Sequence, residues 1–184
     1  TSASPMSRLE SIRQRRDVSA VVKPFIGGSR LNTDPRQHPN RFIIDLGRLD
    51  ETVARRAQPE LMAVLEEKVK PDRSQKSAAV RRTPWWRFYN DRANFFAQAK
   101  ALELSRYVVT ARNSQTAAFC FLPASVVANE KVVIFASGKD AFLAILQCRV
   151  HEIWSRFFNA TLKDDLQYAI SDCYHNFPFP ADWA

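Results

Sequence analysis

Three apolar runs follow one another closely along residues 106–137, and they constrain the fold more than any other feature of the sequence. They read RYVVTA (106–111), TAAFCFLP (116–123) and KVVIFAS (131–137). Each has the length and the β-branched or aromatic content of a strand. The connection RNSQ (112–115) is short enough for a hairpin turn or a loop at a groove. The region predicts three strands that lie close together.

A helical pattern follows these strands over residues 141–157. Apolar residues recur every three or four positions, as in a helix with one buried face. The predicted stripe is Phe142, Leu146, Val150, Ile153 and Phe157, widened by Leu143 and Trp154. Ser137 with Asp140 resembles a capping box at its start.

The first hundred residues add one strand and several helices. A strand is predicted at 41–47, and helices at 50–57 with Asp50 as N-cap, at 59–70 between Pro59 and Pro71, and at 91–104 with Asp91 as N-cap. Residues 71–84 are predicted to be a polar, basic loop. Because strands and helices do not alternate as βαβ units, the predicted class is α+β: a small, mostly antiparallel or mixed sheet packed with several helices in a single domain.

Positive charge is concentrated in the first half of the chain. The net charge is +8, but residues 1–100 hold 20 Lys and Arg against 11 Asp and Glu, and residues 101–184 hold 7 against 8. The densest stretch, 68–92, also carries Trp85 and Trp86. Such a patch attracts polyanions, and the tryptophans could stack on DNA or on a partner, although one of them should be core. A solvated, charged surface loop is the alternative.

Residues 112–116 carry side chains suited to base recognition. Arg112, Asn113, Gln115 and two hydroxyls offer the donors and acceptors that read guanine and adenine edges. An ordinary polar turn is an equally good interpretation of the same residues.

Catalytic and metal motifs are weak by comparison. With four glycines and no G-x-G-x-x-G or Walker A pattern, the sequence offers no nucleotide or S-adenosylmethionine loop. Residues 176–179 (NFPF) resemble a methyltransferase motif but are interpreted as structural, and the letters of a nuclease site at 66–72 occur in reversed order. Cys148, His151, Cys173 and His175 could form a zinc site, but a buried thiol and a core histidine are the commoner arrangement. The sequence therefore predicts no catalytic residue and no metal.

The chain also carries signals about its context. It has no membrane-length apolar run and no secretory signal, and its three cysteines suit reduced thiols in a cytoplasmic protein. Without an initiator Met, it is expected to be an excised fragment.

Six segments together resemble one family. They are NRFIIDLG, LEEKVKPDR, WWRFYNDR, SRYVVTARNSQ, AILQCRVHEIW and DLQYAISDCYHNFPFP. They resemble the target recognition domain of type IIG/IIL (MmeI-like) adenine-specific DNA methyltransferases of restriction–modification and phage-defence systems. Ala169 and Ile170 depart from the family's usual Thr-Pro at that position.

The resemblance implies a function and a set of site residues. Residues 41–184 would be a DNA target recognition domain, inactive alone, and residues 1–40 an extended connector or N-terminal arm. Its partners would be double-stranded DNA and a methyltransferase domain of the same parent chain, which would bind S-adenosylmethionine; no membrane is implied. The resemblance assigns base contacts to Arg112, Ser114, Gln115 and Thr116, and phosphate contacts to Lys70, Arg73, Arg81 and Arg82. The alternatives are a module that docks an acidic protein through its basic-aromatic surface, and a self-sufficient nuclease or hydrolase.

Overall fold

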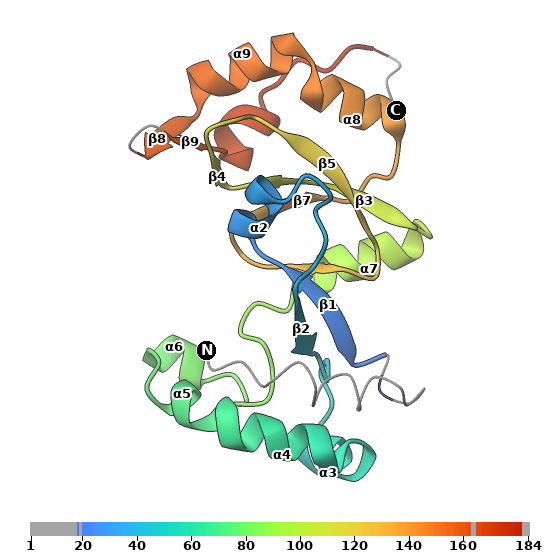
Figure 1. The fold of residues 1–184 in the computed structure, drawn as a ribbon, viewed down its shortest axis with the longest axis vertical. Coiled ribbons are helices and arrows are strands. Elements are labelled where there is room, and N and C mark those ends of the chain that lie inside the picture. The colour runs from blue at the N-terminus through green and yellow to red at the C-terminus, as the bar shows by residue number, and fades with distance from the viewer. Residues whose placement is uncertain (1–17, 19, 163–164, 182–184) are drawn as a thin grey trace. The chain divides into compact units, whose positions relative to one another are not determined.

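A computed structural model describes residues 18, 20–162 and 165–181 of the chain. It confirms one α+β domain, whose contacts separate into two compact units (Figure 1). Unit 1 comprises the described residues up to Lys23 together with Phe42–Arg92, and unit 2 comprises Pro24–Arg41 with the described residues from Ala93 onward. No helix in these described ranges is long and apolar enough to cross a membrane.

Unit 1 is built mainly from short helices. They are α3 (Glu51–Ala57), α4 (Pro59–Lys68), α5 (Lys70–Ser74) and α6 (Ala78–Arg81). Strand β2 (Arg41–Ile44), apart from its first residue, also belongs to this unit. Leu61, Met62 and Leu65 of α4 are buried in its core. The predicted strand and the first two helices are confirmed.

Two predictions in unit 1 are wrong in detail. The stretch predicted to be a loop, 71–84, contains α6 and most of α5, because Pro71 begins a helix instead of ending one. Asp50 occupies the N-cap position of α3 but makes no capping hydrogen bond, and its carboxylate lies 3.4 Å from the Arg87 guanidinium.

Unit 2 is organised around an antiparallel sheet of order β5-β3-β7. Its strands are β3 (Arg106–Ala111), β5 (Phe119–Pro123) and β7 (Val132–Phe135), which confirms the three predicted strands. In β3, Tyr107 and Val109 belong to one buried cluster, and Val108 belongs to the other. Strand periodicity therefore fills both faces of this sheet with apolar side chains, which explains the nearly continuous apolar runs in the sequence.

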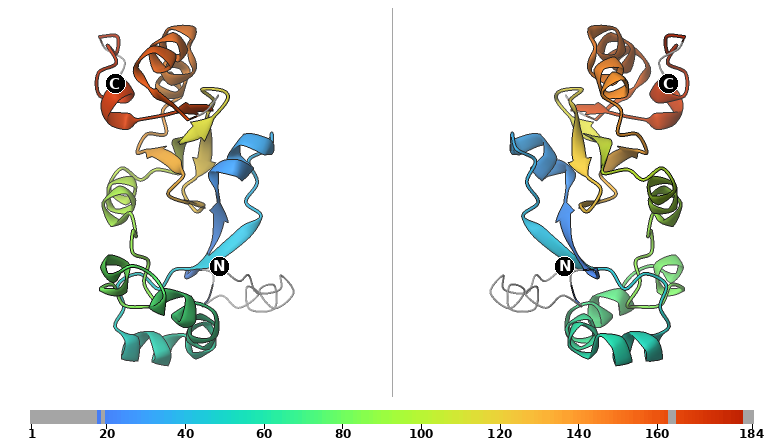
Figure 2. Two further views of the ribbon diagram at one scale, coloured as in Figure 1. Left: turned by 90° about the vertical axis from the view of Figure 1, so that its left-hand side faces the viewer. Right: turned by 90° about the vertical axis from the view of Figure 1, so that its right-hand side faces the viewer.

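Helices cover both faces of this sheet (Figures 1 and 2). α8 (Asp140–Gln147) packs Phe142 and Leu146 against one face. α7 (Ala93–Ala101) and α2 (Gly28–Thr33) place Phe95 and Leu31 in the cluster on the other face.

Smaller strands complete unit 2. β1 (Val22–Ile26), which belongs to this unit from Pro24 onward, pairs in parallel with β6 (Val127–Ala128) through its last two residues. β9 (Asp165–Gln167) pairs with β8 (Ala160–Leu162) and with β4 (Asn113–Ser114). A π-helical turn, η1 (Ile170–Tyr174), follows. β1 and α2 show regular structure within the predicted connector; residues 1–17 and 19 of that connector lie outside the described residues, and the boundary at residue 40 stays a prediction.

The predicted single helix over 141–157 is two helices. α8 ends at Gln147 and α9 (Arg149–Phe158) begins after Cys148, whose backbone is extended. The break turns α9 so that His151 and Ser155 are buried, while Val150, Ile153 and Phe157 are 55–80% exposed. The predicted stripe is therefore correct in α8; in α9 it is correct for Trp154, which packs against the core, and wrong for Val150, Ile153 and Phe157.

Two predicted caps are also wrong. Lys139, not Ser137, occupies the N-cap of α8, and no side chain caps it. α7 begins at Ala93, two residues after Asp91, and Asp91 pairs instead with Arg48 at 3.1 Å.

Candidate nucleic-acid interface

The loop between β3 and β5 has a backbone that neighbouring elements hold at its start. We call residues 112–118 the recognition segment. The Arg112 N–H donates to the carbonyl of Lys131 at 2.8 Å, and the Arg112 carbonyl accepts from the N–H of Tyr168 at 2.7 Å. Asn113 and Ser114 then form β4, which pairs with β9. The start of the segment is thus clamped between two strands.

The end of the recognition segment is fixed by α8 and β3. Gln147 Oε1 accepts from the N–H of Phe119 at 2.7 Å, and Gln147 Nε2 donates to the Ala117 carbonyl at 3.3 Å. The Thr110 hydroxyl donates to the Ala118 carbonyl at 2.8 Å. With its backbone groups used in this way, the segment can present side chains in a defined geometry.

Three of the four residues predicted to contact bases point their side chains to the surface. Arg112, Gln115 and Thr116 are exposed. Ser114 is only 8% exposed, and its Oγ accepts from the Thr116 N–H at 3.2 Å. Ser114 therefore shapes the turn, and the surface of the segment consists of a guanidinium, an amide and a hydroxyl.

α2 lies beside the recognition segment. Asn32 Nδ2 donates to the Asn113 carbonyl at 3.0 Å. Two hollows, of about 430 and 190 Å³, lie where α2 meets the recognition segment. The larger is lined by Gly28, Ser29, Asn32, Thr33, Arg112, Asn113, Lys131 and Asp165.

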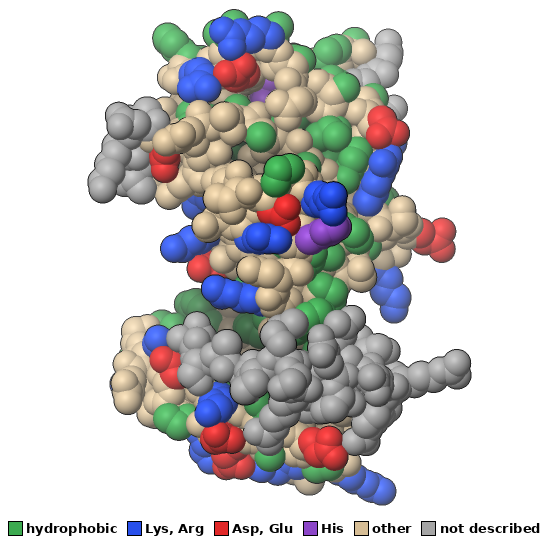
Figure 3. Space-filling view, in the orientation of Figure 1, with side chains coloured by type: hydrophobic (Ala, Val, Ile, Leu, Met, Phe, Trp, Pro, Cys, Tyr) green, Lys and Arg blue, Asp and Glu red, His purple; other side chains and the backbone are tan. Residues whose placement is uncertain are grey.

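The larger hollow has a mostly apolar surface, although amide and charged side chains are among the residues that line it. Asn113 Oδ1 is buried and has no hydrogen-bond partner within the described part of the chain. Lys131 and Arg112, both exposed, add two cations to the lining. Figure 3 shows Lys and Arg side chains on the face of unit 2 that carries α2. Because Asn113 Oδ1 is buried, the groups that a ligand can reach here are the two cations, which favour negative charge, and Asp165, which opposes it.

Sequence reasoning missed the contribution of α2. It described residues 1–40 as a connector, since α2 has a single buried apolar side chain, Leu31, and hence no periodic signal. The available signal was the order of an apolar run, Gly27-Gly28 and a short polar stretch, which is typical of a strand–turn–helix.

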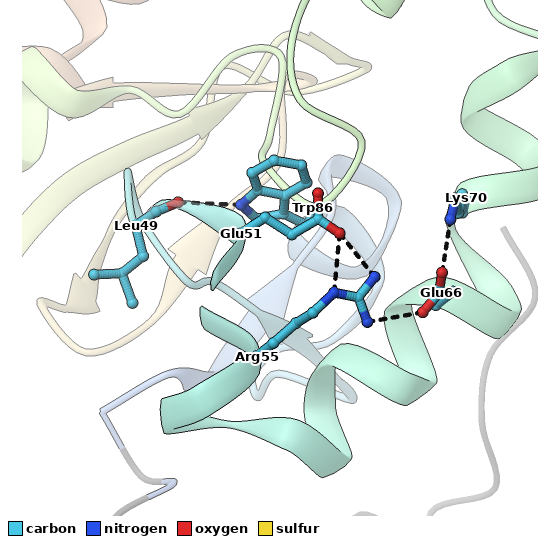
Figure 4. A network of polar contacts seen from close by, with 6 residues as sticks. All are labelled: Leu49, Glu51, Arg55, Glu66, Lys70 and Trp86. Carbon is cyan, nitrogen blue, oxygen red and sulfur yellow. Dashed lines mark hydrogen bonds and ion pairs between the residues drawn. The ribbon is translucent and has the colours of Figure 1, made fainter. Parts of the chain in front are cut away.

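The four predicted phosphate ligands in unit 1 differ in their surroundings. Lys70 is bound to Glu66 at 2.6 Å within the chain Glu51–Arg55–Glu66–Lys70 (Figure 4). Hydrogen bonds from Arg55 and Lys70 lower the pKa of Glu66 to about 2.

Arg73 also has a hydrogen-bond partner, whereas Arg81 and Arg82 have no side-chain partner among the described residues. The Arg73 guanidinium donates to the Arg87 carbonyl. Arg81 and Arg82 are exposed and have no side-chain partner among the residues that the structure describes. The structure thus leaves Arg81 and Arg82 open to a phosphate and occupies Lys70 and Arg73.

Both tryptophans pack partly buried against the core of unit 1. Trp85 lies beneath Lys70, at 5.1 Å from ring centroid to Nζ, and Trp86 donates from Nε1 to the Leu49 carbonyl at 3.1 Å. Phe88 and Tyr89, 41% and 58% exposed, are the more accessible aromatics of this stretch. Stacking by Trp85 or Trp86 remains a prediction.

His151 and Cys173 are buried in unit 2, whereas Cys148 is only partly buried and caps α9. The ring nitrogens of His151 contact the Leu146 carbonyl at 2.7 Å and the Tyr168 hydroxyl at 3.1 Å. Cys173 Sγ lies 3.1 Å from the Ser155 hydroxyl, and His175 is exposed. The described residues include no group of three or more side chains placed to hold a metal ion. His151, which is fully buried with a protein partner on each ring nitrogen, is therefore a core histidine.

The turn at Gly28 and the NFPF segment are each held by contacts within the chain. A Cβ at Gly28 would lie 2.9 Å from the Lys131 carbonyl oxygen, so the protein's own backbone occupies the space at the β1–α2 turn. Asn176 of the NFPF motif donates to the carbonyls of Ser171 and Asp172, and Phe177 is buried.

Comparisons with known proteins bear on this geometry. The family model described as "MmeI, target recognition domain" matches residues 4–181. A solved structure of the type IIL restriction-modification enzyme MmeI in complex with DNA is similar over 97% of this chain, with a TM-score of 0.70 and 18% identity. The chain spans 23% of the length of that enzyme chain. No curated protein matches the chain.

Proposed function

Because the chain belongs to the family of MmeI target recognition domains, we propose that it recognises a specific sequence in double-stranded DNA. One observation carries the proposal: the recognition segment has its backbone held at both ends and its polar side chains exposed. Sequence readout requires side chains that reach base edges in a fixed geometry, and this segment provides them.

The exposed residues of the recognition segment have different roles in this proposal. Arg112 suits the O6 and N7 acceptors of guanine, and Gln115 suits the N6 and N7 groups of adenine. Thr116 offers a hydroxyl to either. Ser114, which is buried, supports the turn without contacting DNA.

Phosphate contacts are assigned to Arg81 and Arg82. Each is exposed and needs no rearrangement to meet an anion, whereas Lys70 and Arg73 would first have to leave their present partners. Phosphate contacts supply affinity but no sequence information.

The proposal places the chemistry outside these 184 residues. A methyltransferase domain of the same parent chain would bind S-adenosylmethionine and methylate adenine. The chain itself would then bind DNA without turnover. Incubation with DNA, divalent metal and methyl donor tests this, and product formation by the 184-residue chain would refute it.

Arg112 and Gln115 should govern sequence preference. We expect the wild-type chain to enrich one duplex from a randomised pool, and Arg112→Ala or Gln115→Ala to reduce its preference for that duplex over a scrambled one by about 5- to 100-fold. Arg149→Ala, which removes another exposed arginine of unit 2 that pairs with Glu152 on α9, is the control and should leave the preference unchanged. Quantitative binding to both duplexes measures the ratio.

The same measurement distinguishes the alternative. A module that docks an acidic protein through its basic surface would bind both duplexes equally, and Arg112→Ala and Arg149→Ala would then have the same effect. That result would contradict sequence recognition.

A further inference from the structure

We propose that α2 is a positioning element for DNA readout: Asn32 and Gly28 determine where the start of the recognition segment lies, so changes at these residues alter sequence preference. The inference rests on the proposed DNA recognition and extends it to a helix outside the recognition segment. Its evidence is a set of contacts between α2, the recognition segment and the turn before β7.

Asn32 holds the peptide bond between Asn113 and Ser114 in place. Its Nδ2 donates to the Asn113 carbonyl at 3.0 Å, across 81 positions of sequence. That carbonyl belongs to the same peptide plane as the Ser114 N–H, so its direction is tied to the path of the backbone through β4. Asn32 thereby orients the backbone between Arg112 and Gln115.

Gly28 acts on the same place through Lys131. A Cβ at Gly28 would lie 2.9 Å from the Lys131 carbonyl oxygen, closer than side-chain carbons approach backbone. That same oxygen accepts the hydrogen bond from the Arg112 N–H at 2.8 Å. A methyl group at residue 28 would therefore displace either α2 or the acceptor that fixes Arg112.

The core transmits such a displacement. Leu31 is 8% exposed and belongs to the buried cluster that also contains Val109 and Ala111 of β3. α2 cannot slide away without disturbing this packing, because cores are close-packed. Part of the strain should therefore reach Arg112, which directly follows β3.

α2 also forms one wall of the larger hollow. Ser29, Asn32 and Thr33 line it from α2, together with Arg112 and Asn113 of the recognition segment. Moving α2 therefore changes the shape of the surface offered to DNA.

Asn32→Ala tests the hydrogen bond, with Asn40→Ala as its control. Asn40 is an exposed asparagine that makes no side-chain contact among the described residues. We expect Asn32→Ala to lower the preference for the enriched duplex over a scrambled one by about two- to tenfold, the value of a lost hydrogen bond. Affinity for the scrambled duplex should stay within about twofold, and Asn40→Ala should change neither.

A second readout reports position without DNA. Amide hydrogen exchange in residues 112–118 should be faster in Asn32→Ala than in Asn40→Ala, because the recognition segment loses one of its ties. A role limited to overall stability would raise exchange throughout unit 2 and weaken binding to both duplexes alike.

Gly28→Ala tests the close approach, with Gly27→Ala as its control. A Cβ at Gly27 would meet Asn129 Nδ2 at 3.1 Å, in a side chain whose Oδ1 accepts from the Lys131 N–H at 3.0 Å, so Gly27→Ala presses on a side chain and not on the carbonyl that fixes Arg112. Gly28→Ala should therefore reduce the preference more than Gly27→Ala. If Gly28→Ala fails to fold, the result for Asn32→Ala alone determines whether α2 positions the recognition segment.

The outcomes separate this inference from the proposed function. If the wild type enriches a duplex and Asn32→Ala retains the full preference, α2 is not a positioning element, although DNA recognition stands. If the wild type enriches no duplex, the proposed function fails and this inference fails with it.

Discussion

His151 shows how a polar side chain can belong to the core of this fold. A carbonyl can only accept, so the 2.7 Å contact with Leu146 places the ring proton on Nδ1. Nε2 then accepts from the Tyr168 hydroxyl at 3.1 Å. Burial lowers the pKa of His151 below its ordinary value of 6.5, while the hydrogen bond to Leu146 opposes this shift. Both nitrogens are satisfied only in the neutral ring.

A pH dependence of stability follows from this neutral ring. Below about pH 6.5 the unfolded chain binds a proton at this histidine that the folded chain does not bind. Stability should therefore decrease as the pH falls from about 7 toward the lowered pKa, by up to about 1.4 kcal/mol per pH unit. Urea unfolding at pH 7.5, 6.5 and 5.5 measures the slope.

His151→Gln provides the comparison for that slope. Glutamine can donate and accept hydrogen bonds but does not titrate, so this variant should be less stable at pH 7.5 and should lose less stability on acidification. An equal slope in both proteins would show that His151 is not the titrating group.

Residue-scale prediction from the sequence was good where chemistry restricted the alternatives. Three cysteines with no paired framework pointed to free thiols, and the described structure has Cys120, Cys148 and Cys173 free. The capping roles of Asp91 and Ser137 were wrong, because a cap depends on where a helix starts, and packing moved both starts by a residue or two. The pairing of Lys70 with Glu66 was visible as a spacing of four residues, which favours such a pair on a helix.

At the scale of elements, the α8–α9 break marks the limit of hydrophobic periodicity. Phe142 and Leu146 follow the period into the core, and Val150, Ile153 and Phe157 continue it but are exposed. The pattern shows no sign of the break, because Cys148 is compatible with a helix. In the structure Cys148 is extended, and its Sγ accepts from the His151 N–H at 3.5 Å. A sulfur cap and the burial of His151, both tertiary effects, thus replace the predicted helix.

The strands of the β5-β3-β7 sheet could be predicted from the sequence, because their hydrophobic pattern agrees with their burial. Both faces of the β5-β3-β7 sheet are buried, so the runs around Val108, Phe121 and Val133 are apolar at nearly every position. β4 and β9 are too short and polar to give such a signal. Their pairing, which fixes Asn113 and Ser114, depends on contacts more than fifty residues apart in sequence.

Gln147 links α8 to the recognition segment, and its loss should be local. Gln147→Ala removes both hydrogen bonds to the backbone of Ala117 and Phe119, at a cost of about 1–3 kcal/mol. Amide exchange at residues 117–119 should rise, and preference among duplexes should fall. Gln98→Ala, on the exposed face of α7, is the control. If the two variants exchange alike, Gln147 does not hold the recognition segment.

At the scale of the whole molecule, the chain divides its charge and its candidate readout between two units. Arg81 and Arg82 belong to unit 1, and the recognition segment belongs to unit 2. The sequence shows the concentration of positive charge in residues 1–100, but the prediction of a single domain did not include the division into two units. It could not predict which cations are engaged, because this depends on partners such as Glu66 and the Arg87 carbonyl.

Salt dependence tests whether Arg81 and Arg82 contact phosphates. Each phosphate that a protein neutralises adds about −0.9 to the slope of log K against log salt concentration. Replacing both arginines by alanine should make the slope shallower by about 1.8 and weaken binding to all duplexes equally. Arg56→Ala removes an exposed charge of unit 1 that has no side-chain partner in the described chain, and it serves as the control. Fluorescence anisotropy from 50 to 300 mM salt, a range of about sixfold, gives the slopes. Two results would show that DNA binding does not use these two arginines: the double variant keeps the wild-type slope, or Arg56→Ala makes the slope shallower by as much per charge. The phosphate contacts would then lie beside the recognition segment, at exposed cations such as Lys131.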